Sequence, residues 1–184
     1  MRLTATVLAL TLTAPLPAFA QQAGAVDNLP FDEQSRARTT EALQSTLFEL
    51  LALRQHVHQM HWNVVGKEFY QLHEFYAELY GSLDEYIDMV GGRMATLGAP
   101  TDARPSQVVA GAGLEEPPTG YIEGVPDSIE AVLVNYATVS DRLEARIASF
   151  EEDMLTQDLL IGLARAIQKD AWMLRAHVQA PGAD

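Results

Sequence analysis

The sequence predicts an all-α protein: a four-helix bundle in which a long crossover, carrying a short extra helix, joins the second helix to the third. Four long segments repeat apolar residues at the three-and-four spacing of a helix face. Between the second and third segments lies a stretch with proline and glycine that is too long for a turn. A hydrophobic content of 48% over 184 residues, without cysteine, indicates one domain with a substantial core and no disulfide framework.

Residues 1–20 are predicted to be a secretory signal peptide. Arg2 precedes the apolar run TATVLALTLTAPLP, and AFA at residues 18–20 has the small-x-small pattern of a cleavage site. The alternatives are a membrane anchor or a fraying apolar terminus, but the run is too short to span a bilayer and prolines interrupt it. We therefore expect export, to the periplasm or as a secreted protein, of a chain with a tail over 21–31 and a helical domain over 32–180.

The first two helices are predicted over residues 32–65 and 68–97. Asp32 is a suitable N-cap for the first, and segment 63–66 has the Asn and Gly chemistry of a helix stop. Gly98 and the proline two residues later end the second helix. Both apolar stripes indicate core positions: Leu43, Leu47, Leu50, Leu51, Leu53 and Val57, then Leu72, Phe75, Tyr76, Leu79, Tyr80, Leu83, Ile87 and Val90.

Residues 101–126 form the predicted crossover, with one short helix near 106–110. Asp127 is expected to cap a third helix that ends near Asp153, and a fourth helix is predicted over residues 156–178. Their buried faces are expected to comprise Ile129, Val132, Leu133, Tyr136, Val139, Leu143, Ile147 and Phe150, then Leu159, Leu160, Leu163, Ile167, Met173 and Leu174.

Three histidines lie in the last turns of the first helix, and a fourth lies near the start of the second. At about 100° per residue His58 and His61 share a face, whereas His56 points elsewhere. A histidine near a helix C-terminus interacts favourably with the helix dipole, which is a sufficient reason for His56. With His73 and Asp88 on the second helix, the two helices present imidazole and carboxylate groups.

Specific motifs run through these two helices and the segment between them. His61 opens the sequence HWNVVG, a second histidine follows twelve positions later within FYQLHE, and Asp88 lies fifteen positions beyond that. This spacing resembles that of the Dps group of mini-ferritins, ferritin-like proteins that form hollow shells, oxidise iron and in many members coat DNA. The resemblance covers nearly all of the chain after residue 30, including KDAWMLRAH in the last helix. The other matching residues are Trp62, Asn63, Gly66, Phe69, Leu72, His73, Glu74, Ile87, Arg93, Leu97 and Gly98.

The resemblance implies an iron site shared across the two-fold interface between subunits. His61 and His73 of one chain would face Asp88 of its partner, so the site requires a homo-oligomer, expected to be a dodecamer. It also implies that ferrous iron is oxidised, with hydrogen peroxide as the expected oxidant. Larger ferritins build their centre inside one bundle from Glu-x-x-His pairs, and this sequence contains none.

Two positions depart from the Dps pattern. Ala77 stands where the family has an acidic residue, and Gly92 stands where it has a bridging glutamate. Asp84 or His58, each about one turn from an expected ligand, could compensate as a further metal ligand. Otherwise Asp84 is a solvated or inner-wall carboxylate and His58 a surface residue. The centre is expected to hold iron, either as a two-iron site or, given the departures, as one strong and one weak position. An imidazole-rich set would also suit zinc or copper.

Two further features have both a functional and a purely structural interpretation. In this family Trp62 would lie near the site and could absorb stray oxidising equivalents, or it packs in the core. The acidic residues between the third and fourth helices resemble the region that lines iron-entry pores, although acids at a helix end are commonly solvated or interact with the dipole. These pore candidates are Glu151, Glu152, Asp153 and Asp158.

The formal charge of −13 becomes −14 when the signal and its Arg2 are removed, so the mature chain is acidic. Residues 21–40 hold two arginines against three acids and no lysine, and the last seven residues hold no base, which argues against DNA coating. The first hypothesis is an exported mini-ferritin that oxidises and stores iron and protects against oxidative damage. The alternative is a non-enzymatic metal-binding or structural shell with a crippled centre, and charge disfavours a DNA-compacting protein.

Overall fold

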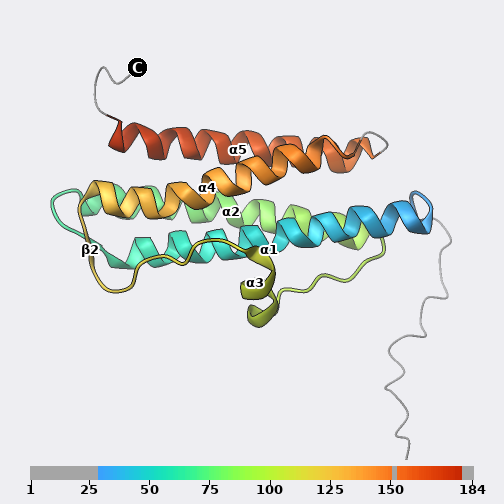
Figure 1. Cartoon of the computed structure of the whole chain (residues 1–184), viewed down its shortest axis with the longest axis horizontal. Helices are drawn as coiled ribbons and strands as arrows, with labels where there is room; N and C mark the ends of the chain where they lie inside the picture. The colour runs from blue at the N-terminus through green and yellow to red at the C-terminus, as the bar shows by residue number, and fades with distance from the viewer. Residues whose placement is uncertain (1–28, 151–152, 180–184) are drawn as a thin grey trace, which may run out of the picture.

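The computed structural model describes residues 29–150 and 153–179, so the predicted signal peptide and most of the predicted tail lie outside the described residues. The crossover carries the short helix α3 (Pro105–Ala112), which lies outside the bundle beside α1. The predicted all-α bundle with a crossover helix is confirmed. Four long helices lie side by side (Figure 1): α1 (Glu33–Asn63), α2 (Phe69–Thr96), α4 (Val125–Ile147) and α5 (Met154–Val178).

All four long helices contribute to one apolar core. Two buried polar groups lack a hydrogen-bond partner among the described residues: the hydroxyl of Tyr136 on α4 and one carboxylate oxygen of Asp170 on α5. None of the described helices is long and apolar enough to cross a membrane. The largest fully buried side chains are Tyr76, Tyr136, Leu43, Leu50, Leu53, Met60, Leu72, Leu83, Met94, Leu97, Ile129 and Leu143.

The start of α1 is set locally, as predicted. The carboxylate of Asp32 accepts the N–H of Ser35 at 2.9 Å, which satisfies a backbone donor that has no partner inside the helix. After α2, Gly98 adopts a φ of 79°, a conformation that favours glycine, and the chain leaves the helix there.

The predicted cap of the third long helix is wrong. α4 begins at Val125, with Gly124 at φ 90° as its N-cap, so Asp127 lies in the first turn. Pro126 accounts for the earlier start, because its fixed φ suits the first turn and its missing N–H needs no partner there. The carboxylate of Asp127 still lies where it favours the helix dipole.

The junction between α4 and α5 also differs from the prediction. α4 ends at Ile147, and Phe150 is buried beyond the helix end. Asp153 does not end the third helix but caps α5: its carboxylate accepts the Thr156 N–H at 3.0 Å and the Thr156 hydroxyl at 2.6 Å. Apolar spacing placed the start of α5 at Thr156, whereas this cap places it at Met154.

A short parallel ladder joins the end of the crossover to the end of α1. β1 (Val64–Val65) follows α1 directly and pairs with β2 (Ile122–Glu123), which precedes α4. The side-chain amide of Gln59 also donates to the carbonyl of Pro118 at 2.8 Å. The turn that leads from α1 to α2 is therefore held against the last part of the crossover.

Arg142 of α4 fixes α3 in place. Its guanidinium donates to the carbonyls of Ala112 at 2.7 Å and Gly113 at 3.0 Å, at the C-terminal end of α3. It also donates at 3.0 Å to the buried carboxylate of Glu49 on α1, which pairs with Arg146 as well. The crossover helix is thereby tied to both α1 and α4, and the face of α1 that carries His58 and His61 stays outside this contact.

Candidate metal centre

The structure brings together two of the predicted site residues, His61 in the last turn of α1 and His73 in the first turns of α2. The turn between the helices, with Gly66 at φ 109°, lets the chain reverse and places the two imidazoles face to face. Their ring centroids lie 3.7 Å apart and their planes differ by 20°. The Dps resemblance, which assigned both histidines to one site, therefore paired two side chains that are in direct contact.

The two imidazoles are oriented by reciprocal hydrogen bonds to the backbone. Nδ1 of His61 lies 2.7 Å from the carbonyl oxygen of His73, and Nδ1 of His73 lies 2.8 Å from the carbonyl oxygen of His61. A carbonyl oxygen only accepts, so each Nδ1 must carry the proton and donate it. In the neutral rings both Nε2 atoms therefore keep their lone pairs, which is the tautomer that a metal ligand requires.

The stacked geometry limits how the two imidazoles could bind an ion. The Nε2 lone pair lies in the plane of its ring, and imidazole nitrogens bind transition metals at about 2.0–2.1 Å. Two stacked rings whose planes differ by only 20° and whose centroids lie 3.7 Å apart do not point both in-plane lone pairs at one ion. His61 and His73 are thus suited to two neighbouring ions, one ligand to each, and not to chelating a single ion.

Asp88 does not join these histidines within one chain. It lies exposed on α2, fifteen residues after His73, which corresponds to about 22 Å along a helix axis. Among residues 29–150 and 153–179, no group of three or more His, Asp or Glu side chains gathers to hold an ion. Within the described part of one chain, the two imidazoles therefore come together without a carboxylate completing a metal site beside them.

The proposed compensating residues, Asp84 and His58, both contact Arg54. The guanidinium of Arg54 donates to the Asp84 carboxylate at 3.0 and 3.2 Å and to Nδ1 of His58 at 3.1 Å. Burial chiefly lowers the pKa of His58, with Arg54 and His61 acting in the same direction and Asp84 opposing them. Arg54 was not singled out from the sequence, although it lies one helical turn before His58, where an interaction is expected.

Aromatic rings extend from the histidine pair along the surface of α1 and α2. The Trp62 ring contacts His58 with centroids 3.9 Å apart and planes tilted by 35°, and the Tyr80 ring lies 4.4 Å from His58 and 5.3 Å from His61. Trp62 is 59% exposed, so the interpretation as a core residue is wrong for this chain. Its position beside His58, three residues before His61, agrees with the expectation that it lies near the site.

His56 faces away from this cluster, as the helical spacing predicted. Its Nδ1 lies 3.0 Å from the side-chain nitrogen of Asn135 on α4. The backbone of Glu115 fixes the orientation of that amide, because its N–H donates to the Asn135 oxygen and its carbonyl accepts from the nitrogen. Burial lowers the pKa of His56, with Glu116 acting in the opposite direction. The hydrogen bond to Asn135 of α4, more than the helix dipole, accounts for the position of the His56 side chain.

Gly92, the position of the missing family glutamate, is an open surface position in an unbroken helix. α2 continues through Gly91 and Gly92 to Thr96, and a Cβ at position 92 would have no neighbour within 4 Å. Within the part of the chain that the structure describes, no neighbouring atom therefore requires glycine there.

The pore candidates have different environments. Asp153 is only 5% exposed, and its carboxylate accepts from Arg93 at 2.8 and 3.1 Å as well as from Thr156. Burial pushes the pKa of Asp153 upward, but these hydrogen bonds outweigh it and hold the pKa below its usual value. This paired, buried group is not a free pore carboxylate of the subunit. Asp158 is exposed on α5, and residues 151–152 lie outside the described part of the chain.

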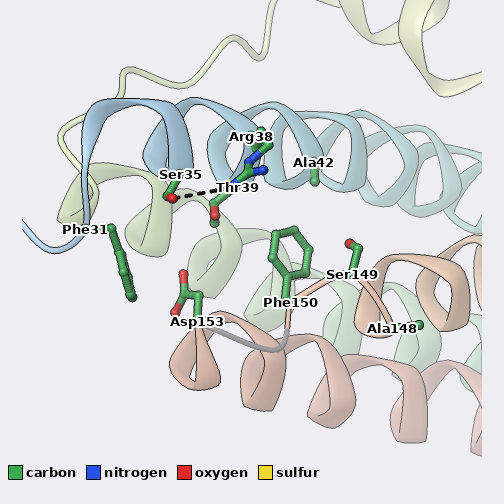
Figure 2. A pocket seen from close by; sticks show the side chains of 9 residues that line it. All are labelled: Phe31, Ser35, Arg38, Thr39, Ala42, Ala148, Ser149, Phe150 and Asp153. Carbon is green, nitrogen blue, oxygen red and sulfur yellow. Dashed lines mark hydrogen bonds between the residues drawn. The ribbon is translucent and has the colours of Figure 1, made fainter.

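A cavity of about 460 Å³ lies beside Asp153, at the opposite end of α1 from the histidine pair. Figure 2 shows Phe31, Phe150 and Asp153 lining it, beneath Arg38 and Thr39 in the first turns of α1. Its described lining residues include no imidazole, and the one carboxylate among them is already paired. The donor set at His61 and His73 therefore remains the better candidate for a metal.

Comparison with known proteins identifies the family. Residues 40–181 match the model of the ferritin-like domain. The chain is 35% identical over 143 residues to DNA protection during starvation protein 2 of Deinococcus radiodurans, a match that covers 77% of this chain and 59% of that protein. It is 30% identical over 138 residues to the protein of the same name from Bacillus anthracis, covering 74% of this chain and 93% of that one. The chain belongs to the Dps group of ferritin-like proteins.

Solved Dps structures have the same fold. The crystal structure of Dps92 from Deinococcus radiodurans superposes with a TM-score of 0.78 at 34% identity, over 82% of this chain and 92% of that one. The tetragonal form of Mycobacterium smegmatis Dps superposes with a TM-score of 0.81 at 25% identity, over 87% of this chain and 98% of that one. The Dps resemblance inferred from HWNVVG and FYQLHE is therefore confirmed, and both motifs lie at the stacked histidines.

Proposed function

We propose that this Dps chain assembles into a hollow shell that oxidises ferrous iron with hydrogen peroxide at centres shared by two subunits, and stores the ferric product inside. The observation that carries this proposal is the stacked pair His61 and His73, whose Nδ1 protons are held by carbonyls and whose Nε2 atoms are both available to metal. The expected assembly is a dodecamer.

The geometry of α2 supports a shared centre. Asp88 is exposed and far along the helix from its own histidines, so it is available to a neighbouring subunit. In a two-fold interface the same surface of both subunits meets, and a contact from one subunit's Asp88 to the other's histidines occurs twice. Each interface would then hold two equivalent centres.

The proposed reaction balances with iron and peroxide alone. Two ferrous ions each lose one electron, hydrogen peroxide accepts both electrons, and its O–O bond breaks. Two protons are taken up and two water molecules form. Holding two ions side by side delivers both electrons together, which avoids one-electron cleavage of peroxide and so would protect against oxidative damage. The two stacked imidazoles supply one ligand to each ion.

A second candidate function rests on the two missing carboxylates. Ala77 and Gly92 stand where two acidic ligands are expected, so the centre could bind metal without oxidising iron efficiently. An imidazole-rich, carboxylate-poor set suits zinc or copper better than the full iron set does. In that case the protein is a metal-binding or structural shell, and Asp84 or His58 would be called on as ligands only if they leave Arg54.

A complementation experiment tests the shared centre. Mature chains carrying Asp88→Ala, and chains carrying both His61→Ala and His73→Ala, are each expected to lose peroxide-dependent iron oxidation. Co-expressed in one shell they should recover roughly a quarter of the wild-type rate if subunits mix at random, because half the interfaces are mixed and each mixed interface rebuilds one of its two centres. Mixing preformed shells should recover nothing.

The outcomes separate the candidates. His177→Ala, an exposed histidine on α5, is the matched control and should leave the rate unchanged. If the mixed shell stays inactive while wild type is active, the centre is not shared. If wild type itself oxidises iron no faster than buffer while binding metal at His61, the non-enzymatic shell is the better description.

We also propose that the chain is exported, most simply to the periplasm, and that it does not coat DNA. The signal pattern ending at AFA supports the first, and a formal charge of −13 supports the second. Intact mass of protein from its native host should correspond to a chain starting at or near Gln21. Gel shifts at low salt should show no retardation of DNA, and strong salt-sensitive binding would contradict this.

A further inference from the structure

Arg54 holds two potential metal ligands at the edge of the histidine pair. It lies on α1 one turn before His58, and its guanidinium reaches α2, where it grips the Asp84 carboxylate with two nitrogens at 3.0 and 3.2 Å. The remaining terminal nitrogen lies 3.1 Å from Nδ1 of His58. The guanidinium carbon lies 5.4 Å from the centre of the Tyr80 ring, so the group is also covered by an aromatic face.

This contact fixes which nitrogen of His58 carries the proton. Arginine has only donors and is not deprotonated in proteins, so Nδ1 of His58 must be the acceptor. The proton of the neutral ring is then on Nε2. Its two nitrogens are thus both occupied, one by the Arg54 N–H and the other by the proton. To bind metal through Nε2, the ring would need its proton on Nδ1, where it would oppose the Arg54 N–H.

His61 shows the opposite arrangement less than one turn away. Its Nδ1 donates to a carbonyl, so its Nε2 is free. The two rings are 5.9 Å apart between centroids, which is close enough for His58 to approach an ion at His61 if it could turn and change tautomer. A third imidazole would shift the donor set toward zinc and copper, which compete effectively with ferrous iron at nitrogen sites.

We propose that Arg54 is a positioning residue that withholds His58 from the metal centre, anchored by Asp84, and so limits the affinity of the centre for zinc and copper. The inference rests on the proposed function, in that His61 and His73 bind metal. It assigns to Arg54 a role in metal selectivity that an ion pair between α1 and α2 would not have by itself. It also implies that the missing family glutamate is not replaced by His58 in the wild type.

The experiment measures zinc binding by calorimetry, and the visible spectrum of bound cobalt, in the assembled mature protein. Arg54→Met keeps the side-chain stem over Tyr80 and removes the donors. It should bind zinc about ten-fold more tightly than wild type, a typical effect for a change next to a metal ligand, and the cobalt spectrum should change as a nitrogen ligand is added. In the Arg54→Met/His58→Ala double variant both changes should disappear.

Two further variants separate this role from simple charge. Arg54→Lys keeps the positive charge but cannot bind Asp84 and His58 together, so it should show part of the gain in zinc affinity. The same variant replaces Arg54→Met in the test if Arg54→Met does not assemble. His58→Ala alone should leave zinc affinity unchanged, because His58 is not a ligand in the wild type. A gain that persists without His58 would be electrostatic and would overturn the proposal, as would a loss of affinity in His58→Ala.

The result also distinguishes this inference from the function on which it rests. If wild type binds zinc in a way that His61→Ala abolishes, and Arg54→Met leaves the affinity unchanged, only the role of Arg54 is wrong. If wild type shows no binding that depends on His61, the proposed centre and this inference both fail.

Discussion

His61 and His73 differ from His56 and His58 in the partner of a single ring atom. In the first pair Nδ1 donates its proton to a backbone carbonyl, and Nε2 is left with a lone pair. In the second pair Nδ1 accepts an N–H from a side chain, and the proton of the neutral ring is on Nε2. All four lie near the same end of the bundle, so the difference is not one of location. The hydrogen-bond partner of Nδ1 therefore decides whether Nε2 of a histidine is available as a metal ligand.

The largest expected effect tests this difference directly. His61→Ala removes a ligand nitrogen and should weaken metal binding at least about 100-fold, since losing only a supporting hydrogen bond already costs 10–100-fold. His56→Ala should leave metal affinity unchanged and lower the free energy of unfolding by about 1–3 kcal/mol, because it leaves the Asn135 N–H without a partner. Calorimetry and thermal melts measure the two. Equal loss of metal binding in both variants would contradict the claim that His61 can act as a ligand whereas His56 cannot.

Carboxylates allow the same comparison, because Asp153 is paired with Arg93 whereas Asp170 has an oxygen with no hydrogen-bond partner among residues 29–150 and 153–179. Burial raises the pKa of Asp170 to about 6 from 3.8, with Lys169 acting in the opposite direction. The unfolded chain loses this proton at lower pH than the native protein, so the stability contribution falls as pH rises from about 4 to about 6 and stays low above that.

Asp170→Asn should therefore raise stability above pH 7 by on the order of 2 kcal/mol and change it little at pH 4. The asparagine matches the shape of the protonated acid and carries no charge. Denaturant unfolding of the variant and wild type at pH 4 and pH 8 measures this. A stabilisation of equal size at both pH values would show that ionisation of Asp170 is not the cause.

A smaller effect concerns the ligand that α2 lacks. Gly92→Glu removes a helix-interior glycine, worth about 1 kcal/mol of stability, and supplies a carboxylate at an open surface position. It should speed peroxide-dependent iron oxidation about ten-fold if the centre lacks a bridging ligand, a change of about 1.4 kcal/mol in the barrier. Gly92→Ala is the matched control: it should show the same gain in stability but no increase in the rate of iron oxidation. A rate gain in Gly92→Ala would assign the effect to helix order.

The parts of the fold that sequence reasoning predicted are those set by residues close together in the chain. Asp32 caps α1 through a side chain three residues away, and the long apolar stripes defined the four helices. The start of α4 was wrong because Asp127 was given the cap, whereas the chain enters the helix from β2, whose partner strand follows α1. Such a pairing between distant segments leaves no local pattern.

The candidate centre likewise has features set by residues close together in the chain and features set by distant segments. His61 and His73 were paired from the Dps resemblance, and their imidazoles are in contact because the turn between the helices is short. Arg54 and Asp84 are thirty residues apart, and their ion pair could be anticipated only by aligning α1 with α2. Asp88 was assigned from the Dps resemblance, and its role depends on a second subunit, which no property of a single chain specifies.

The two-residue ladder between Val64 and Ile122 has a consequence for local unfolding. Segments that share hydrogen bonds tend to open together as one cooperative unit. β1 lies between His61 and His73, so separating the stacked rings by fraying the α1–α2 turn also requires the end of the crossover to detach. The rate at which this turn opens is thereby coupled to the opening of β2, nearly sixty residues further along the chain.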